Sequence, residues 1–219
     1  LAPSFLGARH NYAYVLNRQN KLAKALEQLD QLLASDPRNP GYRNLHAAVL
    51  GRVGEYEKSL QVYAEVLKEY PRNAKVWMSY GHSLKTAGKQ GECVTTYRRA
   101  IELAPNLGEA YWSLANLKTF RFSREDVAVM QEQLTRGKLS EEDRFHFHFS
   151  LGKAFEDEAD YARSFEYYEQ GNKLRRELVH YDADENAQHV QRSKQVLTAE
   201  FFATRKEWGC PAPDPIFIV

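Results

Sequence analysis

Residues 74–105 read AKVWMSYGHSLKTAGKQGECVTTYRRAIELAP, a pattern that indicates two antiparallel helices joined by a turn. In the first half, Trp77, Tyr80 and Leu84 have the spacing i, i+3 and i+7, so they form one apolar stripe along a helix. Gly88 follows this stripe, and glycine commonly ends a helix because it adopts the left-handed conformation without strain. The stretch therefore predicts a pair of packed helices.

Small and large residues alternate where the two helices are expected to cross. Gly81 carries no side chain, so the partner helix can come close, and Cys93 and Ala100 are also small. Tyr97 is large and is expected to fill the space between the helices. Because one helix pair cannot bury its own apolar face, we expect the unit to recur along the chain.

The unit does recur with a fixed period. Pro37, Pro71 and Pro105 are spaced 34 residues apart, and a proline at this place is expected to end each unit. Asn20 stands where Gly88 stands in the later unit, and asparagine can also take the left-handed conformation. The series resembles the tetratricopeptide repeat.

We therefore predict an all-α fold, a superhelix of tetratricopeptide repeats in which antiparallel helix pairs form an α-solenoid. The expected units are three repeats at 6–39, 40–73 and 74–107, a degenerate fourth repeat at 108–139, a fifth repeat-like helix pair at 140–178, and a capping helix at 182–207.

The degenerate unit lacks the usual glycine turn. Its first helix is expected over 108–119, and its second helix is expected to begin after Ser123 as the N-cap and to end near Gly137. Ser140 is followed by three acidic residues and is expected to open the fifth pair in the same way.

Composition limits the class of protein. The chain has 219 residues, 43% of them hydrophobic and 27% charged, which is enough for a sizeable core. The net charge is +1 and basic and acidic residues are interspersed, so we expect neither a nucleic-acid partner nor a membrane partner. Two cysteines favour a reducing compartment, and we expect a cytoplasmic protein. The chain does not begin with Met, so we expect it to be part of a longer protein.

The character of the sequence changes at Trp208. Residues 208–219 read WGCPAPDPIFIV, which predicts a proline-rich linker followed by the first strand of an α/β domain. The order of repeats, the aromatic pair Phe201 and Phe202, the linker and this strand resembles the bacterial tetratricopeptide-repeat sulfotransferases.

That resemblance implies a parent protein that is a PAPS-dependent sulfotransferase, with the donor held by a phosphate-binding loop after Val219. No donor-binding or catalytic residue of the family lies within this chain, so we expect no catalytic residue, cofactor or metal in it. An enzyme complete within these residues is also disfavoured because no acid, base and nucleophile converge in the sequence.

The resemblance to tetratricopeptide arrays implies a concave groove lined by recurring positions of each first helix. The twelve groove residues expected here are His10, Tyr14, Asn17, Arg18, Asn44, Arg52, Lys75, Met78, His82, Lys85, Trp112 and Asn116. Their amides, cations and aromatic rings suit an extended peptide. A solvated polar surface, or a surface covered by the missing domain, is the alternative.

Two functions follow as expectations. The first is a module that binds a polypeptide, or a second copy of itself, for a C-terminal sulfotransferase domain. The second is a free-standing scaffold or chaperone adaptor, although the carboxylate clamp of chaperone-binding members is not reproduced at matching positions.

Two short motifs suggest metal sites but fit them poorly. His146 and His148 are two residues apart on an expected helix and would point in nearly opposite directions. The run beginning at Asp182 resembles an EF-hand loop but lacks its glycine and its final glutamate, so helix capping is the simpler interpretation.

Overall fold

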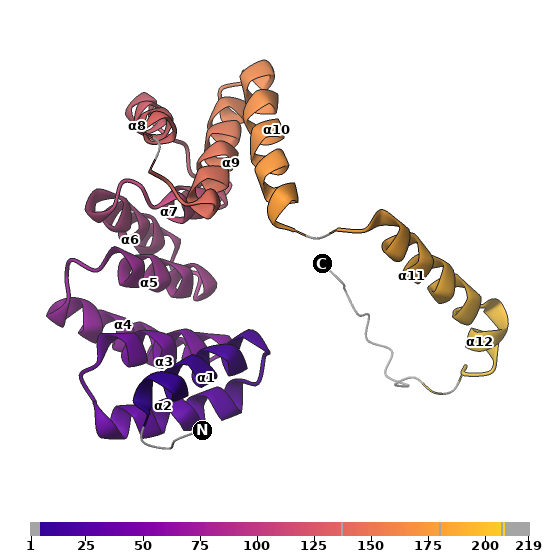
Figure 1. The fold of residues 1–219 in the computed structure, drawn as a ribbon, viewed down its shortest axis with the longest axis horizontal. Coiled ribbons are helices and arrows are strands. Elements are labelled where there is room, and N and C mark those ends of the chain that lie inside the picture. Colours follow the sequence, from indigo (N-terminus) through magenta and orange to yellow (C-terminus); the bar gives the residue numbers. More distant parts are fainter. Residues whose placement is uncertain (1–4, 137, 180, 207, 209–219) are drawn as a thin grey trace. The chain divides into compact units, whose positions relative to one another are not determined.

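The computed structural model describes residues 5–136, 138–179, 181–206 and 208, and these residues form helices joined by short turns (Figure 1). The helices are α1 (Leu6–Arg18), α2 (Leu22–Ser35), α3 (Pro40–Arg52), α4 (Tyr56–Glu69), α5 (Ala74–Thr86), α6 (Gln90–Leu103), α7 (Gly108–Ala115), α8 (Arg124–Thr135), α9 (Glu141–Asp157), α10 (Tyr161–Leu178), α11 (Ala183–Val196) and α12 (Ala199–Ala203). The prediction of an all-α fold is confirmed. The chain divides into two compact units, Leu1–Arg175 and Arg176–Val219.

The first six helices form three similar hairpins, each with a first helix of 13 residues and a second of 14. The turn inside each hairpin contains one residue with a positive φ: Asn20 at 59°, Gly54 at 93° and Gly88 at 76°. These positions recur with the sequence period, and the left-handed conformation predicted for Asn20 is confirmed.

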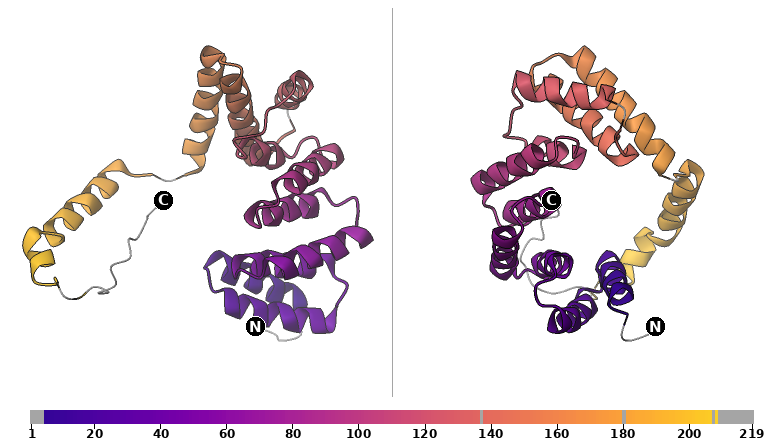
Figure 2. Two further views of the ribbon diagram at one scale, coloured as in Figure 1. Left: turned by 180° about the vertical axis from the view of Figure 1, so that it is seen from behind. Right: turned by 60° about the vertical axis from the view of Figure 1, so that its left-hand side comes forward.

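The hairpins stack in chain order (Figure 2), because each second helix also packs on the next first helix, as α2 does on α3 and α4 on α5. Asparagine starts the next unit: Asn39 accepts hydrogen bonds from the backbone N–H groups of Gly41 and Tyr42, and Asn73 accepts one from Val76. These bonds satisfy amides that a helix start leaves unpaired. The repeated asparagine therefore fixes where α3 and α5 begin.

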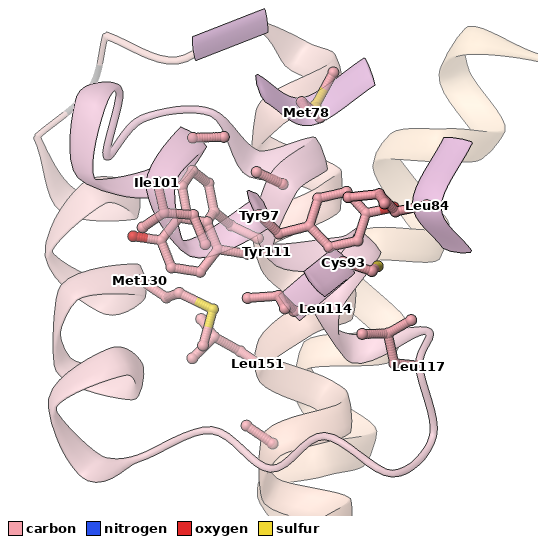
Figure 3. Close-up of a cluster of buried hydrophobic side chains, with 14 of the residues drawn as sticks. Met78, Leu84, Cys93, Tyr97, Ile101, Tyr111, Leu114, Leu117, Met130 and Leu151 are labelled. Atoms are coloured by element: carbon pink, nitrogen blue, oxygen red, sulfur yellow. The ribbon is translucent and has the colours of Figure 1, made fainter. Parts of the chain in front are cut away.

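The largest buried cluster joins the third repeat to the helices that follow it. Leu84 of α5, Tyr97 of α6, Tyr111 of α7, Met130 of α8 and Leu151 of α9 all belong to it (Figure 3). Each is almost fully buried, so the core continues through α9. This is how a solenoid gains stability, since every unit buries its neighbour's apolar face.

The fourth unit departs from the expectation for 108–119. Helix α7 ends at Ala115, and Lys118 in the following segment has a φ of 58°, which a continuous helix cannot contain. Phe120 and Phe122 of that segment pack against the core instead of extending a helix. The predicted start of α8 is confirmed, because Ser123 and Asp126 form a reciprocal capping box.

Helices α7 and α9 lie directly side by side in this unit. The backbone N–H of Gly108 donates to Asp143 Oδ1 at 2.9 Å, and the rings of Tyr111 and Phe147 are 5.1 Å apart. Both contacts advance along the two helices in the same direction, so α7 and α9 run parallel. The carboxylate of Asp143 thereby caps the N-terminus of α7, where a negative charge is favoured by the helix dipole.

The second compact unit corrects the prediction of one helix over 182–207. The described residues of 182–207 form two helices, because the chain leaves the helical conformation at Leu197 and Thr198 caps α12 by accepting from the N–H of Phe201. No described residue of α11 or α12 is buried. The predicted strand, and the predicted linker except for Trp208, lie outside the described residues.

Candidate functional site

Arg52 at the end of α3 is held by the first repeat. Its Nη1 donates to Asn17 Oδ1 at 2.6 Å and also to the backbone oxygen of Asn17, and its Nη2 donates to Asn20 Oδ1 at 3.1 Å. All three acceptors are uncharged, so the guanidinium keeps its full positive charge while its direction is restricted. Arg52 and Asn17, both predicted for the groove, are therefore brought together.

His82 of α5 connects the third repeat to α7. Its Nδ1 lies 2.8 Å from the hydroxyl of Tyr97, and its Nε2 lies 3.6 Å from Glu109 Oε1. The hydrogen bond with His82 lowers the pKa of Glu109, and burial raises the pKa of Tyr97. At neutral pH the imidazole therefore lies between a carboxylate and a protonated phenol.

A cavity of about 420 Å³ opens between α3 and α5, and we call it the α3–α5 pocket. Arg52 and His82 both line it, so the structure places two predicted groove residues at one site. The other lining residues are Ala48, Gly51, Tyr56, Tyr63, Ser79, Ser83 and Thr86. The pocket exists because the facing residues of the two helices are small, and hydroxyl groups supply most of its remaining polar atoms.

The predicted lining was wrong at Met78. This side chain is 8% exposed and belongs to the buried core, so it does not present a surface to a bound segment. Trp112 is half-buried, with its ring 5.5 Å from that of Phe149, so it packs against α9. His10 is likewise half-buried, with its ring 5.2 Å from that of Tyr42.

The remaining predicted groove residues are mostly at the surface. Asn44 is half-buried, and its Oδ1 is buried without a hydrogen-bond partner among the described residues. The exposed members are Tyr14, Arg18, Lys75, Lys85 and Asn116. Lys75 lines a second, larger cavity of about 770 Å³ at the turns before α5 and α7, together with Arg72, Tyr70 and Leu107.

Several lining residues of the α3–α5 pocket were not predicted from the sequence, notably Ser79, Ser83 and Thr86. A signal for them was present, because small or polar residues stand at Ala48 and Gly51 of α3 and at Ser79 and Ser83 of α5. Two neighbouring helices with small residues on facing sides leave a hollow between them.

The two histidine positions considered for a metal face different neighbours. His146 lies beside Phe145 with a ring separation of 4.4 Å, whereas His148 lies 5.9 Å from the ring of Tyr167 on α10. The described part of the chain contains no group of three metal-ligating side chains. Asp182 caps α11 by accepting from the N–H groups of Asp184 and Glu185.

Burial of three histidines predicts a pH-dependent stability. Burial lowers the pKa of His46, His146 and His148 from the ordinary value of 6.5, although Asp30 and Glu109 act against it at the first two. Well above pH 6.5 these imidazoles are neutral in both the folded and the unfolded chain. Below it the unfolded chain binds protons that the folded chain does not, so the free energy of unfolding should fall.

Urea unfolding at a series of pH values on either side of that value measures the effect. His146→Gln should flatten the decline, whereas His189→Gln on exposed α11 should leave it unchanged. A stability that does not change as the pH falls from neutrality would contradict the assignment of buried, neutral imidazoles.

Comparisons with known proteins agree with this geometry. A family model described as "Tetratricopeptide repeat" matches residues 74–107, which confirms that the chain carries such a repeat. An uncharacterized protein of Aquifex aeolicus (strain VF5) is 25% identical over 138 residues. The matched region is 63% of this chain but only 18% of that protein, so the chain spans a small part of this relative.

Three solved structures share the fold at low sequence identity. MamA from Desulfovibrio magneticus RS-1 has a TM-score of 0.53 at 18% identity, covering 81% of this chain and 98% of its own. A thermophilic TPR protein of Thermus thermophilus has a TM-score of 0.57 at 12% identity, with coverages of 77% and 91%. YrrB, described as a TPR protein with an unusual peptide-binding site, has a TM-score of 0.50 at 17% identity, with coverages of 76% and 84%. These similarities support the solenoid fold.

Among the described residues, no helix is long and apolar enough to cross a membrane.

Proposed function

We propose that this chain is a protein-interaction module, and that the surface formed by α1, α3, α5 and α7 binds an extended segment of polypeptide. The observation that carries the proposal is the α3–α5 pocket, where Arg52 and His82 border a hollow between two first helices. Clefts of this size that combine apolar walls with a few placed polar groups are typical binding sites.

The chemistry of the pocket suits one side chain of the bound segment. Ser79, Ser83 and Thr86 can donate to or accept from a polar group, and Arg52 supplies a charge-assisted donor whose direction is already fixed. A pre-positioned guanidinium loses little side-chain entropy on binding. The preferred occupant is therefore an acidic side chain.

The surface around the pocket favours the same kind of partner. Arg18, Lys75 and Lys85 are exposed on the helices that flank it. Glu109 is the one acidic residue on α1, α3, α5 and α7, and its carboxylate is paired with the imidazole of His82. An acidic segment would be attracted to these cations before it docks.

The test begins with random displayed peptides selected on the whole chain, followed by affinity measurements on the enriched sequences. Arg52→Gln should weaken binding about tenfold, because it removes a charge-assisted hydrogen bond. Lys58→Gln is the matched control, because it also removes one positive charge. Lys58 lies on α4 and does not line the pocket, and its Nζ is 3.0 Å from Glu55 Oε2.

Circular dichroism should show that both variants keep the helical fold. If no peptide is enriched, or if the two variants bind alike, the peptide-binding proposal is wrong. Enrichment of segments of this chain, with dimers in sedimentation, would instead assign the surface to self-association.

We further propose that the module serves a C-terminal PAPS-dependent sulfotransferase domain in a reducing, cytoplasmic compartment. The first part rests on the resemblance carried by residues 214–219 and by the order of elements along the chain. The second rests on the two cysteines, of which Cys93 is buried in the core. Extending the reading frame beyond Val219 tests the first part, because a glycine-rich loop containing Arg and Ser should follow directly. A different sequence there would favour the free-standing scaffold.

A further inference from the structure

A cavity of about 550 Å³ opens between α8, α9 and α10 and shares no residue with the α3–α5 pocket. Arg144 and His148 of α9 line it, as do Arg163, Tyr167 and Gln170 of α10. The lining residues all belong to the first compact unit, and the three helices are labelled in Figure 1. The cavity is thus a second candidate site, outside the helices proposed to bind peptide.

The cavity lies in the irregular part of the solenoid. In the regular hairpins the two helices of a pair pack mainly on each other, as α5 does on α6. Here α7 packs mainly on α9, with contacts that include Gly108 and Asp143, and α8 packs on α9. Polar side chains of α8, α9 and α10 line most of the space between these three helices.

Positively charged and hydrogen-bond-donating groups dominate the lining. Arg163 is fixed in two ways: its guanidinium lies 4.2 Å from the centre of the Phe155 ring, and its Nη2 lies 2.6 Å from Asp160 Oδ2. The Tyr167 hydroxyl accepts a hydrogen bond from Gln131 Nε2 at 3.0 Å, which leaves its own proton free to be donated. These contacts hold donors in place without a bound molecule.

Acceptors are fewer than donors in this cavity. Glu166 is the one carboxylate in the described lining, against the two guanidinium groups of Arg144 and Arg163, and Asp160 pairs with Arg163 from outside the lining. A cation would meet both guanidinium groups, and an apolar molecule would leave several polar groups without partners. The excess of donors favours an anion.

His148 provides an independent indication of an absent ligand. Its side chain is 8% exposed, and its Nδ1 is buried without a hydrogen-bond partner in the described part of the chain. Such a nitrogen costs free energy unless something bonds to it. Burial and the nearby Arg144 lower the pKa of His148, so at neutral pH the ring offers hydrogen bonding and the arginines provide the charge.

We propose that the cavity between α8, α9 and α10 is a binding site for a small molecule that carries an oxyanion, either a carboxylate or a phosphate. Arg144 and Arg163 bind the oxyanion, and Tyr167, Gln170 and His148 complete its hydrogen bonds. The site is independent of the peptide-binding surface, so either proposal can fail without the other.

The experiment is a titration of the isotope-labelled whole chain followed by NMR. The probes are inorganic phosphate and citrate in separate arms, with sodium chloride at matched ionic strength as the reference. We expect saturable shifts of the amides of α9 and α10 near Arg144 and Tyr167, with a dissociation constant below about 1 mM for at least one probe. The arm that saturates identifies phosphate or carboxylate as the preferred group.

Two variants separate a built site from general attraction to positive charge. Arg144→Gln should weaken binding about tenfold, because a charge-assisted bond is lost. Arg124→Gln removes the same charge from an exposed residue of α8 outside the cavity and should leave binding unchanged. Gln170→Ala is a second test that keeps every charge in place and should weaken binding by a smaller factor.

Chemical shifts that rise linearly with the concentration of both probes, without saturation, would overturn the proposal. So would an equal loss of affinity in Arg144→Gln and Arg124→Gln. Either outcome would mean association with an adventitious ion only.

Discussion

Gly108→Ala is expected to lower the free energy of unfolding by about 3 kcal/mol, a large part of the roughly 5–15 kcal/mol that typically stabilises a folded domain. A Cβ at this position would lie 2.3 Å from the backbone oxygen of Asp143 and 2.9 Å from its carbonyl carbon. Backbone atoms cannot rotate away as a flexible side chain can. The added methyl group must therefore push α7 and α9 apart.

That separation would also break other contacts between the two helices. The hydrogen bond from the Gly108 N–H to Asp143 Oδ1 would lengthen, and the Tyr111 ring would move from that of Phe147. Both rings are almost fully buried, so the movement would open space in the core.

Chemical denaturation of the variant and of Gly91→Ala measures the effect. Gly91 lies in α6, and a Cβ there would meet no atom within 4 Å, so the same substitution should stabilise the chain by about 0.5 kcal/mol. An equal change in both variants would show that α7 and α9 are not in close contact at Gly108.

The regular part of this fold could be predicted from the sequence because local chemistry repeats there. Asn20, Gly54 and Gly88 mark three equivalent turns, and Ser123 marks the start of α8 through its capping box. In each case a residue type with a special backbone or capping property stands where that property is needed.

The early end of α7 could not be predicted in the same way. The residues after Ala115 include no glycine or proline to mark a helix end, and Leu117 and Phe120 pack into the core shared with α6, α8 and α9. Tertiary packing decided the helix boundary against local preference.

The candidate sites depended even more on tertiary structure. Arg52 was predicted for the groove, but its fixed direction comes from Asn17 and Asn20 in the preceding repeat. The prediction for Met78 was wrong because the groove positions were assigned from the repeat pattern alone. That pattern does not show how much of the helix surface its neighbours cover. The cavity beside His148 had no signal in the sequence because it depends on how three successive helices, α8, α9 and α10, pack together.

Gly81 and Tyr97 are expected to show a strong, specific coupling in a double-mutant cycle. A Cβ at Gly81 would lie 2.5 Å from Cε1 and 2.7 Å from Cδ1 of the Tyr97 ring. Tyr97 is fully buried and its hydroxyl lies 2.8 Å from His82 Nδ1, so the ring has no free space to move into. Gly81→Ala should therefore cost about 2 kcal/mol despite the better helix propensity of alanine.

The sign of that substitution should reverse once the ring is gone. Tyr97→Ala alone should cost about 4 kcal/mol through the cavity it leaves. In that background Gly81→Ala meets no ring and should gain about 1 kcal/mol, the ordinary difference between alanine and glycine inside a helix. The coupling energy is the difference between the two effects of Gly81→Ala, about 3 kcal/mol.

Gly152 and Tyr168 provide a matched comparison within the same chain. A Cβ at Gly152 would lie 2.7 Å from the Tyr168 ring, but that ring is half-buried and its hydroxyl donates to Glu156 at the surface. Because Tyr168 can move outward, Gly152→Ala should cost less than Gly81→Ala in the same denaturation experiment. Equal costs would mean that the glycines matter only for backbone conformation. A larger cost at Gly81 would show that the buried tyrosine sets how closely the two helices of a repeat approach.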